Sequence, residues 1–290
     1  MKTLSPIFSQ QVVRLNRNIQ VLTARKQGIY HSSSPISLLI DQSVDQFPKI
    51  KPILQQGKIT RLFIKEDKDN YERLFYSLLL RMANTKILRY LCAEIIKKSF
   101  HFRATIMALP RFPNLITLWI YCNFLCTLLK DQEYTIIAKS VQKMRFLQEF
   151  NLEVTGPKAP LIIMPLKTLN KSLKSLKIST GPKENLPILL PELAKFQSLE
   201  NFGIIVSRNS DGELTLDDLS PIFANLQNIS TLKFLKFVTR LAPNTIKAFS
   251  LLEGINLQGL SLTLNSKPLS QDEAALLKNI IRTFKFQRLR

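Results

Sequence analysis

Apolar residues recur along this chain in a spacing typical of short strands. The clearest stretch begins at Leu115 and continues through Leu118 and Ile120, with polar or aromatic residues between them. Residues two positions apart lie on the same face of a β-strand, so this stretch predicts a short strand with one buried face. Asn123 follows, and its side chain can hydrogen-bond to backbone groups that a turn leaves unpaired. The stretch therefore predicts a strand followed by a tight turn.

The same apolar phase returns along most of the chain. Its first members are separated by about 26 to 32 residues, which is too regular to arise readily by chance. Asn265 repeats the turn asparagine in the last copy, and a partial ninth copy begins at Phe286. The copies are Ile59/Leu62/Ile64, Leu88/Leu91/Ala93, Leu115/Leu118/Ile120, Leu147/Phe150/Leu152, Leu173/Leu176/Ile178, Leu199/Phe202/Ile204, Ile229/Leu232/Phe234 and Leu257/Leu260/Leu262.

Helical patterns occupy the intervals between these predicted strands, because apolar residues there recur three or four positions apart. Ser270 and Glu273 have the spacing of a capping box, which marks the start of a helix. The predicted helical segments are 69–82, 135–144, 186–196, 216–226, 244–252 and 270–284. The chain thus predicts a repeated strand, turn and helix.

The spacing L-x-x-L-x-L-x-x-N-x-L at 115–125 resembles the signature of leucine-rich repeats, and the repeat length is similar to that of the long, ribonuclease-inhibitor-like α/β members. The resemblance implies an α/β fold, a right-handed solenoid of about eight strand-turn-helix repeats. Its parallel sheet would line the concave side and its helices the convex side. It also implies one leucine-rich-repeat domain over residues 58–290, preceded by a basic N-terminal arm and cap over residues 1–57.

The N-terminal arm has an unusual charge pattern. No acidic residue precedes Asp41, whereas Lys2, Arg14 and Arg17 are among the basic residues of this segment. This composition is similar to that of a mitochondrial transit peptide. A basic arm that lies on RNA or on another subunit has the same composition. We therefore expect a mitochondrial location, with a cytoplasmic one as the alternative.

The segment 112–129 is an uncharged run long enough to meet the lower limit for a membrane span. Pro113, Asn114 and Asn123 interrupt it, and it coincides with the clearest repeat copy. A buried strand and its turn explain the run better, so we expect no membrane span.

The residues between the repeat leucines should point away from the helices and form the concave surface. Exposed aromatic residues beside arginine are typical of interaction hot spots, and they can also stack on unpaired bases. An alternative is that the N-terminal arm covers Phe63 and Trp119. The later lysines fit an acidic or phosphate-bearing partner, although solvated lysines are common on any surface. The predicted partner-binding residues are Arg61, Phe63, Arg89, Tyr90, Trp119, Tyr121, Lys174, Lys177, Lys233 and Lys236.

Catalytic and metal-binding motifs are missing from the sequence. It has no glycine-rich phosphate loop and no hydrolase or metalloprotease signature around His31 or His101. Cys92, Cys122 and Cys126 are too few for a zinc module or a disulfide framework. We therefore expect no enzyme activity, no cofactor, no metal and no small-molecule substrate.

The chain carries 41 lysines and arginines against 21 acidic residues, a formal net charge of +20. A charge of this size favours a polyanionic or acidic neighbour. Together with the repeats, it suggests a non-catalytic scaffold or adaptor that binds protein subunits of a larger assembly, including a mitochondrial ribonucleoprotein such as the mitochondrial ribosome, with RNA as a further partner. The alternative is a protein-recognition module, a substrate receptor or regulatory repeat protein, that binds one ligand through its concave face.

Overall fold

The structure of the chain is a computed structural model. It describes residues 21–23, 36–40, 59–65, 80, 83, 86–95, 99–122, 131–153, 166, 169, 171–181, 191–206, 214–239, 245–264 and 270–283. Statements below about what the molecule contains refer to these residues.

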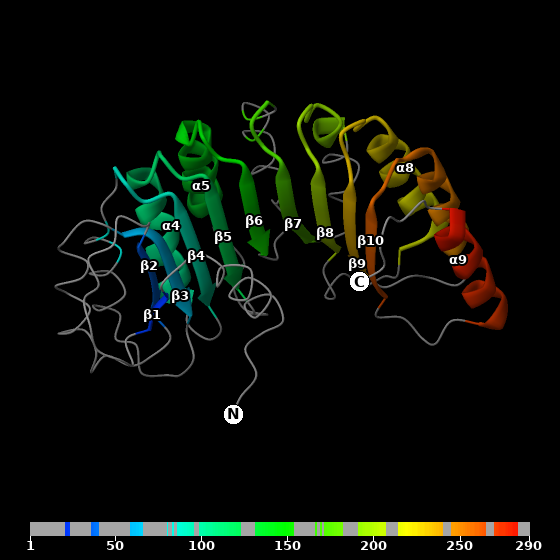
Figure 1. Ribbon diagram of the computed structural model, residues 1–290, viewed down its shortest axis with the longest axis horizontal. Helices are drawn as coiled ribbons and strands as arrows, with labels where there is room; N and C mark the ends of the chain where they lie inside the picture. The colour runs from blue at the N-terminus through cyan, green and yellow to red at the C-terminus, as the bar shows by residue number, and fades with distance from the viewer. Residues whose placement is uncertain are drawn as a thin grey trace.

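One open sheet of ten strands runs through the molecule, and its strands lie side by side in chain order from β1 to β10 (Figure 1). Every neighbouring pair is parallel. The strands are β1 (Val21–Thr23), β2 (Ile36–Ile40), β3 (Ile59–Lys65), β4 (Tyr90–Ile95), β5 (Thr117–Cys122), β6 (Glu149–Glu153), β7 (Ser175–Gly181), β8 (Asn201–Val206), β9 (Phe234–Thr239) and β10 (Gly259–Leu264). This is an α/β fold built by stacking one unit after another.

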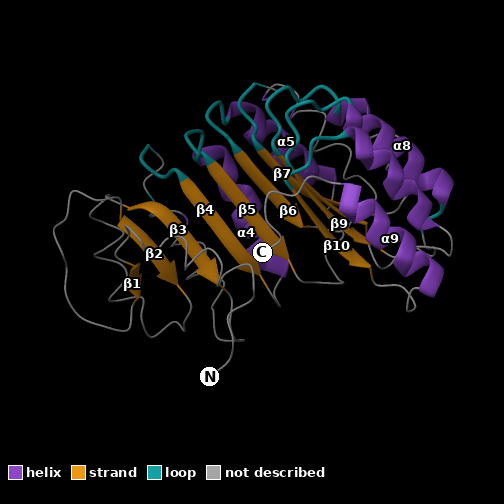
Figure 2. Cartoon of the chain, turned by 45° about the vertical axis from the view of Figure 1, so that its right-hand side comes forward, coloured by secondary structure: helices purple, strands orange, loops and turns teal. Residues whose placement is uncertain are grey.

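The helices of the described ranges lie on one side of the sheet (Figure 2). The α-helices are α4 (Ser99–Ala108), α5 (Asp131–Lys143), α8 (Leu216–Gln227) and α9 (Gln271–Thr283), and the 3-10 helices are η2 (Leu109–Arg111) and η5 (Thr245–Gly254). Parallel strands need a crossover between them, and these helices provide it. Their apolar sides pack on the sheet and close the core.

The core is formed by the apolar positions of the repeat. Leu118 and Ile120 of β5 are buried against the helices, and so are Leu176 and Ile178 of β7. Aromatic rings pack on one another in the C-terminal part, where the ring centroids of Phe223 and Phe249 are 5.0 Å apart. Buried residues from β3 through α9 belong to one continuous cluster. The repeats therefore fold as neighbours that share a single core.

A ladder of backbone hydrogen bonds joins the repeats where each strand begins. The carbonyl oxygen of Lys174, for example, accepts hydrogen bonds of 2.9 Å from both Glu200 N and Asn201 N of the next repeat. Equivalent carbonyl oxygens belong to Arg89, Ile116, Gln148, Lys174, Glu200 and Lys233. We call the line of these residues the strand-entry edge. Its regularity shows that the repeat units superpose in backbone as well as in sequence.

The eight predicted strands are confirmed as β3 to β10, but one was placed in the wrong frame. The copy Ile229/Leu232/Phe234 should read Leu232/Leu235/Phe237, because Leu235 pairs with Phe202 and Phe237 with Ile204. Both frames put apolar residues in the required places, so the sequence could not separate them. Burial separates the two frames, because Leu235 and Phe237 are in the core, whereas Phe234 is 45% exposed.

The predicted helices are confirmed at α5, α8 and α9, with ends that shift by a few residues. Segment 244–252 is a 3-10 helix, η5, rather than an α-helix. The capping box at the start of α9 is present, since Ser270 Oγ accepts a hydrogen bond from Glu273 N at 3.2 Å. Residues 191–193 of segment 186–196 are helical, whereas 186–190 lie outside the described residues. Segment 69–82 lies outside them as well, apart from Leu80, as do Asn123, Asn265 and Phe286.

Two features were not predicted. Helix α4 was not predicted, because apolar residues lie on several of its sides and give no clear helical periodicity. Strands β1 and β2 fall within residues 1–57 and extend the sheet beyond β3, so the sheet continues across the expected boundary of the N-terminal arm. Part of the uncharged run 112–129 is strand β5. No helix within the described ranges has the length and apolar character needed to cross a membrane.

Candidate functional site

The open face of the sheet is the candidate functional site. We use this name for the side of the strands that does not pack on the helices. Register brings its side chains into rows that cross the sheet. The first row is Arg61, Tyr90, Thr117, Glu149, Ser175, Asn201, Phe234 and Gly259, and the second is Phe63, Cys92, Trp119, Asn151, Lys177, Gly203, Lys236 and Ser261.

Seven of the predicted binding residues lie on this open face. They are Arg61, Phe63, Tyr90, Trp119, Tyr121, Lys177 and Lys236. The other three lie on the strand-entry edge instead: Arg89, Lys174 and Lys233 each come before the first strand residue and form the hydrogen-bond ladder. Side chains alternate between the two faces of the sheet only within a strand. This rule therefore does not place the side chain of the residue directly before the strand. Placing these three on the concave surface was wrong.

The N-terminal part of the open face is aromatic and closely packed. The guanidinium carbon of Arg61 lies 4.3 Å from the centroid of the Tyr90 ring, a cation–π contact across β3 and β4. In the second row Phe63, Cys92 and Trp119 are neighbours across three strands, and each is partly exposed. Aromatic side chains and one arginine thus form much of this part of the face.

Buried polar groups lie among these aromatic side chains. Burial and the nearby carboxylate of Glu94 raise the pKa of the Cys92 thiol to about 12. The thiol therefore stays protonated at neutral pH and is a poor nucleophile. Burial also raises the pKa of Glu149, while a hydrogen bond from Thr117 acts in the opposite direction. Asn151 Oδ1 is buried without a hydrogen-bond partner within the protein.

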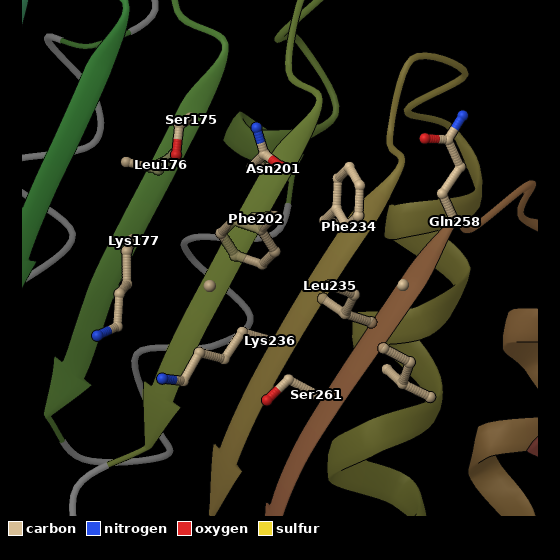
Figure 3. Close-up of a pocket in the computed structure, with 13 residues that line it drawn as sticks. Ser175, Leu176, Lys177, Asn201, Phe202, Phe234, Leu235, Lys236, Gln258 and Ser261 are labelled. Carbon is tan, nitrogen blue, oxygen red and sulfur yellow. The ribbon is translucent and has the colours of Figure 1, made fainter. Parts of the chain in front are cut away.

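The C-terminal part of the open face is hollowed. A cavity of about 490 Å³ spans β7 to β10, and Figure 3 shows its lining. Lys177 and Lys236 contribute amino groups, and Phe234 contributes a ring that is 45% exposed. Hydroxyl and amide groups come from Ser175, Asn201, Gln258 and Ser261. The hollow thus combines an aromatic wall, two cations and several neutral polar groups.

Two glycines create this hollow. A Cβ at Gly203 would lie 2.8 Å from Lys177 Cγ, and one at Gly259 would lie 2.8 Å from Phe234 Cδ1. Such distances are well below ordinary carbon contacts, so the side chains of Lys177 and Phe234 lean across strands that carry no side chain at those places. Glycine in a strand interior often marks a close approach of this kind. Phe234 was missed because of the frame error in β9. The two glycines lie in β8 and β10, where a glycine gives no signal in an apolar pattern.

The described residues contain no group of three or more histidines, cysteines and acidic residues that could hold a metal ion. His31 and Cys126 lie outside these residues, and Cys122 lies in β5. The groups that the hollow offers are suited to binding: its amino groups can pair with a carboxylate or phosphate, and its aromatic wall can contact an apolar or planar group.

No protein-family model and no curated protein matches this chain. The function must therefore be inferred from the open face, the strand-entry edge and the charge of the chain.

Proposed function

We propose that this protein is a non-catalytic scaffold or adaptor, a structural subunit of a larger assembly, built as a right-handed leucine-rich-repeat solenoid. The ordered parallel strands, the helical crossovers and the repeated hydrogen-bond ladder support this type of repeat. Crossovers between parallel strands are nearly always right-handed, which supports the handedness. Solenoids offer long surfaces that suit the binding of other chains.

The hollow on the open face carries the proposal. Phe234 is a large apolar side chain that is 45% exposed beside Lys177 and Lys236. Interface hot spots are enriched in aromatic residues set in pockets, and amino groups beside them favour an acidic neighbour. The partner that fits is a protein segment with an apolar side chain to contact Phe234 and a carboxylate near the lysines.

The charge of the chain supports a ribonucleoprotein as the assembly. A net charge of +20 favours residence in a particle rich in phosphate. The composition of the N-terminal arm supports a mitochondrial particle, including the mitochondrial ribosome, with the cytoplasm as the alternative location. Most of the arm lies outside the described residues, so this part of the proposal depends on its sequence.

The alternative function is a recognition module that captures one protein ligand transiently. The depth of the hollow favours it, because a cavity of about 490 Å³ can accept an inserted side chain. A stable subunit and a transient receptor differ in the size and lifetime of the complex, and this difference can be measured.

The test uses the full chain with an affinity tag, expressed in cells that naturally produce it. A structural subunit is expected to sediment with a large particle, and ribonuclease treatment should change that sedimentation if RNA is present. A transient receptor should sediment alone or with one partner after dilution. Sedimentation as a free monomer under all conditions, with no protein captured, contradicts both functions.

A pair of phenylalanines provides a matched control for the open face. Phe234→Ala removes the exposed aromatic group of the hollow, and Phe146→Ala removes an exposed aromatic group at the strand-entry side, where 59% of Phe146 is exposed. In extract treated with ribonuclease, we expect Phe234→Ala to lower capture of the protein partner by about tenfold or more, as hot-spot truncation does, and Phe146→Ala to leave this RNA-independent capture unchanged. Equal losses would show that the hollow is not the binding site.

A further inference from the structure

Four exposed cations on one stretch of the strand-entry edge have no ion-pair partner among the described residues. Lys143, Arg145, Lys171 and Lys174 are all exposed, and they lie in the two connections that lead into β6 and β7. None of the four side chains has an ion-pair or hydrogen-bond partner among the described residues. We call these four residues, together with Phe146, the basic edge.

The repeat places these cations in register. Lys174 is the ladder residue before β7 and Gln148 is the ladder residue before β6. Lys171 and Arg145 each lie three residues before them, so they occupy the same place in consecutive repeats. Adjacent strands are about 4.8 Å apart, and equivalent residues should follow at a similar spacing. The result is a row of cations rather than a random scatter.

A structural role explains only one of these cations. Lys143 is in the last turn of α5, where a positive charge interacts favourably with the helix dipole. Arg145 lies beyond the end of that helix, and Lys171 and Lys174 lie in the connection directly before β7. Arg89 illustrates the contrasting case, because its guanidinium donates to the carbonyl oxygen of Asn114 at 3.1 Å.

Phe146 is the second feature of the basic edge. It is 59% exposed, although it is large and apolar. Asn114 and Ser198 occupy the same place in other repeats, two residues before the ladder residue. Asn114 donates to Lys86 O at 3.2 Å, and Ser198 donates to Lys171 O at 3.0 Å. Phe146 cannot make this bond, so it replaces a structural polar group with an exposed aromatic ring.

We infer that the basic edge binds single-stranded nucleic acid, with its cations on successive phosphates and the Phe146 ring stacked on an unpaired base. Proteins that bind single strands combine a positive track with aromatic side chains on which bases stack. An acidic protein surface would also match the cations, but it does not account for an aromatic ring exposed among them. The two observations together favour a polyanion that carries planar groups.

This inference deepens the proposed function by locating RNA on a defined surface, and it depends on that function only for RNA being present in the assembly. The subunit role and the RNA-binding surface can be disproved by different experiments. Sedimentation with a large particle tests the subunit role in cells, whereas the experiment below measures direct binding by the purified chain.

The probe is a labelled single-stranded RNA of mixed sequence, titrated with the purified full chain at several salt concentrations. Each phosphate contact of a single strand contributes about 0.7 to the slope of log K against log salt, which is about fivefold in affinity at ~0.1 M salt. The double variant Lys171→Gln/Lys174→Gln should therefore lower the slope by about 1.4 and the affinity by about 25-fold.

The matched control is Lys195→Gln/Lys233→Gln. It removes two lysines from the same edge, but these lysines are paired with Glu192 at 2.6 Å and Glu200 at 3.0 Å. Both double variants change the net charge equally, so only the location differs. We expect the control to lose less than about threefold, since paired cations have few counterions to release. Equal losses in the two variants would overturn the inference, because binding would then follow the total charge.

Phe146→Ala separates nucleic acid from other polyanions. Stacking of one base is worth about 1–3 kcal/mol, so this variant should bind the RNA about 5- to 100-fold more weakly. Its binding to inorganic polyphosphate, which has no bases, should not change. Unchanged RNA affinity in Phe146→Ala overturns the inference. So does equal binding of RNA, polyglutamate and anionic lipid vesicles, which would favour an acidic protein or a membrane surface. Thermal unfolding of each variant checks that the fold is retained.

Discussion

Lys174 and Lys233 occupy the same place in the repeat, and each carbonyl oxygen accepts two hydrogen bonds from the following repeat. Lys233 pairs with Glu200 at 3.0 Å, whereas the side chain of Lys174 has no partner among the described residues. The same contrast separates Lys195, which pairs with Glu192, from Lys143, which likewise lies five residues before its ladder residue. One edge therefore contains a neutralised stretch before β8 and β9 and an unneutralised stretch before β6 and β7.

This difference shows that the fold does not require a particular charge at the exposed positions of this edge. The backbone ladder needs no particular side chain at these exposed places, so lysine, glutamate, glutamine and isoleucine all occur in it. Carboxylates could neutralise the basic stretch without disturbing the backbone ladder, yet none of the described carboxylates pairs with the four cations of the basic edge. Unpaired cations on a regular frame indicate a partner outside the chain.

The largest expected effect comes from breaking the core that both stretches share. Leu176 of β7 is fully buried at 0% exposure, so Leu176→Ala should lower the free energy of unfolding by about 2–5 kcal/mol. Urea denaturation measures this change. Lys174→Ala, on the exposed edge two residues away, should stay within about 0.5 kcal/mol. A small effect at Leu176 would contradict a continuous core.

A variant that gains RNA affinity also tests the contrast between paired and unpaired lysines on this edge. Glu192→Gln/Glu200→Gln frees Lys195 and Lys233 and would extend the row of unpaired cations. RNA affinity should rise, by about fivefold at ~0.1 M salt for each lysine that reaches a phosphate. Stability should change by less than about 1 kcal/mol, because exposed ion pairs contribute little. Unaltered affinity would mean that RNA does not reach this stretch.

Phe146→Ser tests whether the exposed ring contributes to the free energy of unfolding, and we expect that it does not. Serine restores the polar group that Ser198 supplies in its own repeat, where it donates to a carbonyl oxygen at 3.0 Å. The serine variant should unfold with a free energy about 0.5–1.5 kcal/mol higher than that of Phe146→Ala. Both variants should lose RNA binding alike. Chemical denaturation and RNA titration of the pair give the two results, and a less stable serine variant would contradict the equivalence of these places.

Glu149, at the start of β6 in the first row of the open face, should produce the smallest effect. Burial raises its pKa above 4.5, so the folded state binds the proton more tightly than the unfolded state does. Its contribution to stability is complete below about pH 4.5 and is lost as the pH rises through the folded-state pKa. Glu149→Gln should therefore be more stable than the wild type at neutral pH, with a difference that disappears in acid.

Thr117→Val provides the companion variant for Glu149. The Thr117 hydrogen bond lowers the pKa of Glu149, so its removal should raise that pKa further and steepen the pH dependence of unfolding. Thermal unfolding across a pH series measures both variants. Parallel stability curves for the wild type and Glu149→Gln would show that the side chain is not effectively buried.

The strands could be predicted from the sequence because their signal is local. Apolar residues such as Leu118 and Ile120 lie two positions apart, and burial of one face requires that spacing. The binding surface was predicted less well. Phe234 was assigned to the core, because an apolar residue three places away fits the same pattern. Only packing against β8 distinguishes the two frames.

Sequence alone determined the number and order of the strands from β3 to β10, since each strand must bury its apolar face and its apolar residues recur at a regular interval. It also determined the excess of positive charge. Tertiary structure decided where that charge is unpaired, because Glu200 meets Lys233 across about thirty intervening residues. It also decided that glycines on neighbouring strands open a hollow beside Phe234. Both results depend on contacts between side chains that strand register brings together. Such contacts join residues far apart in the sequence, so local patterns do not predict them.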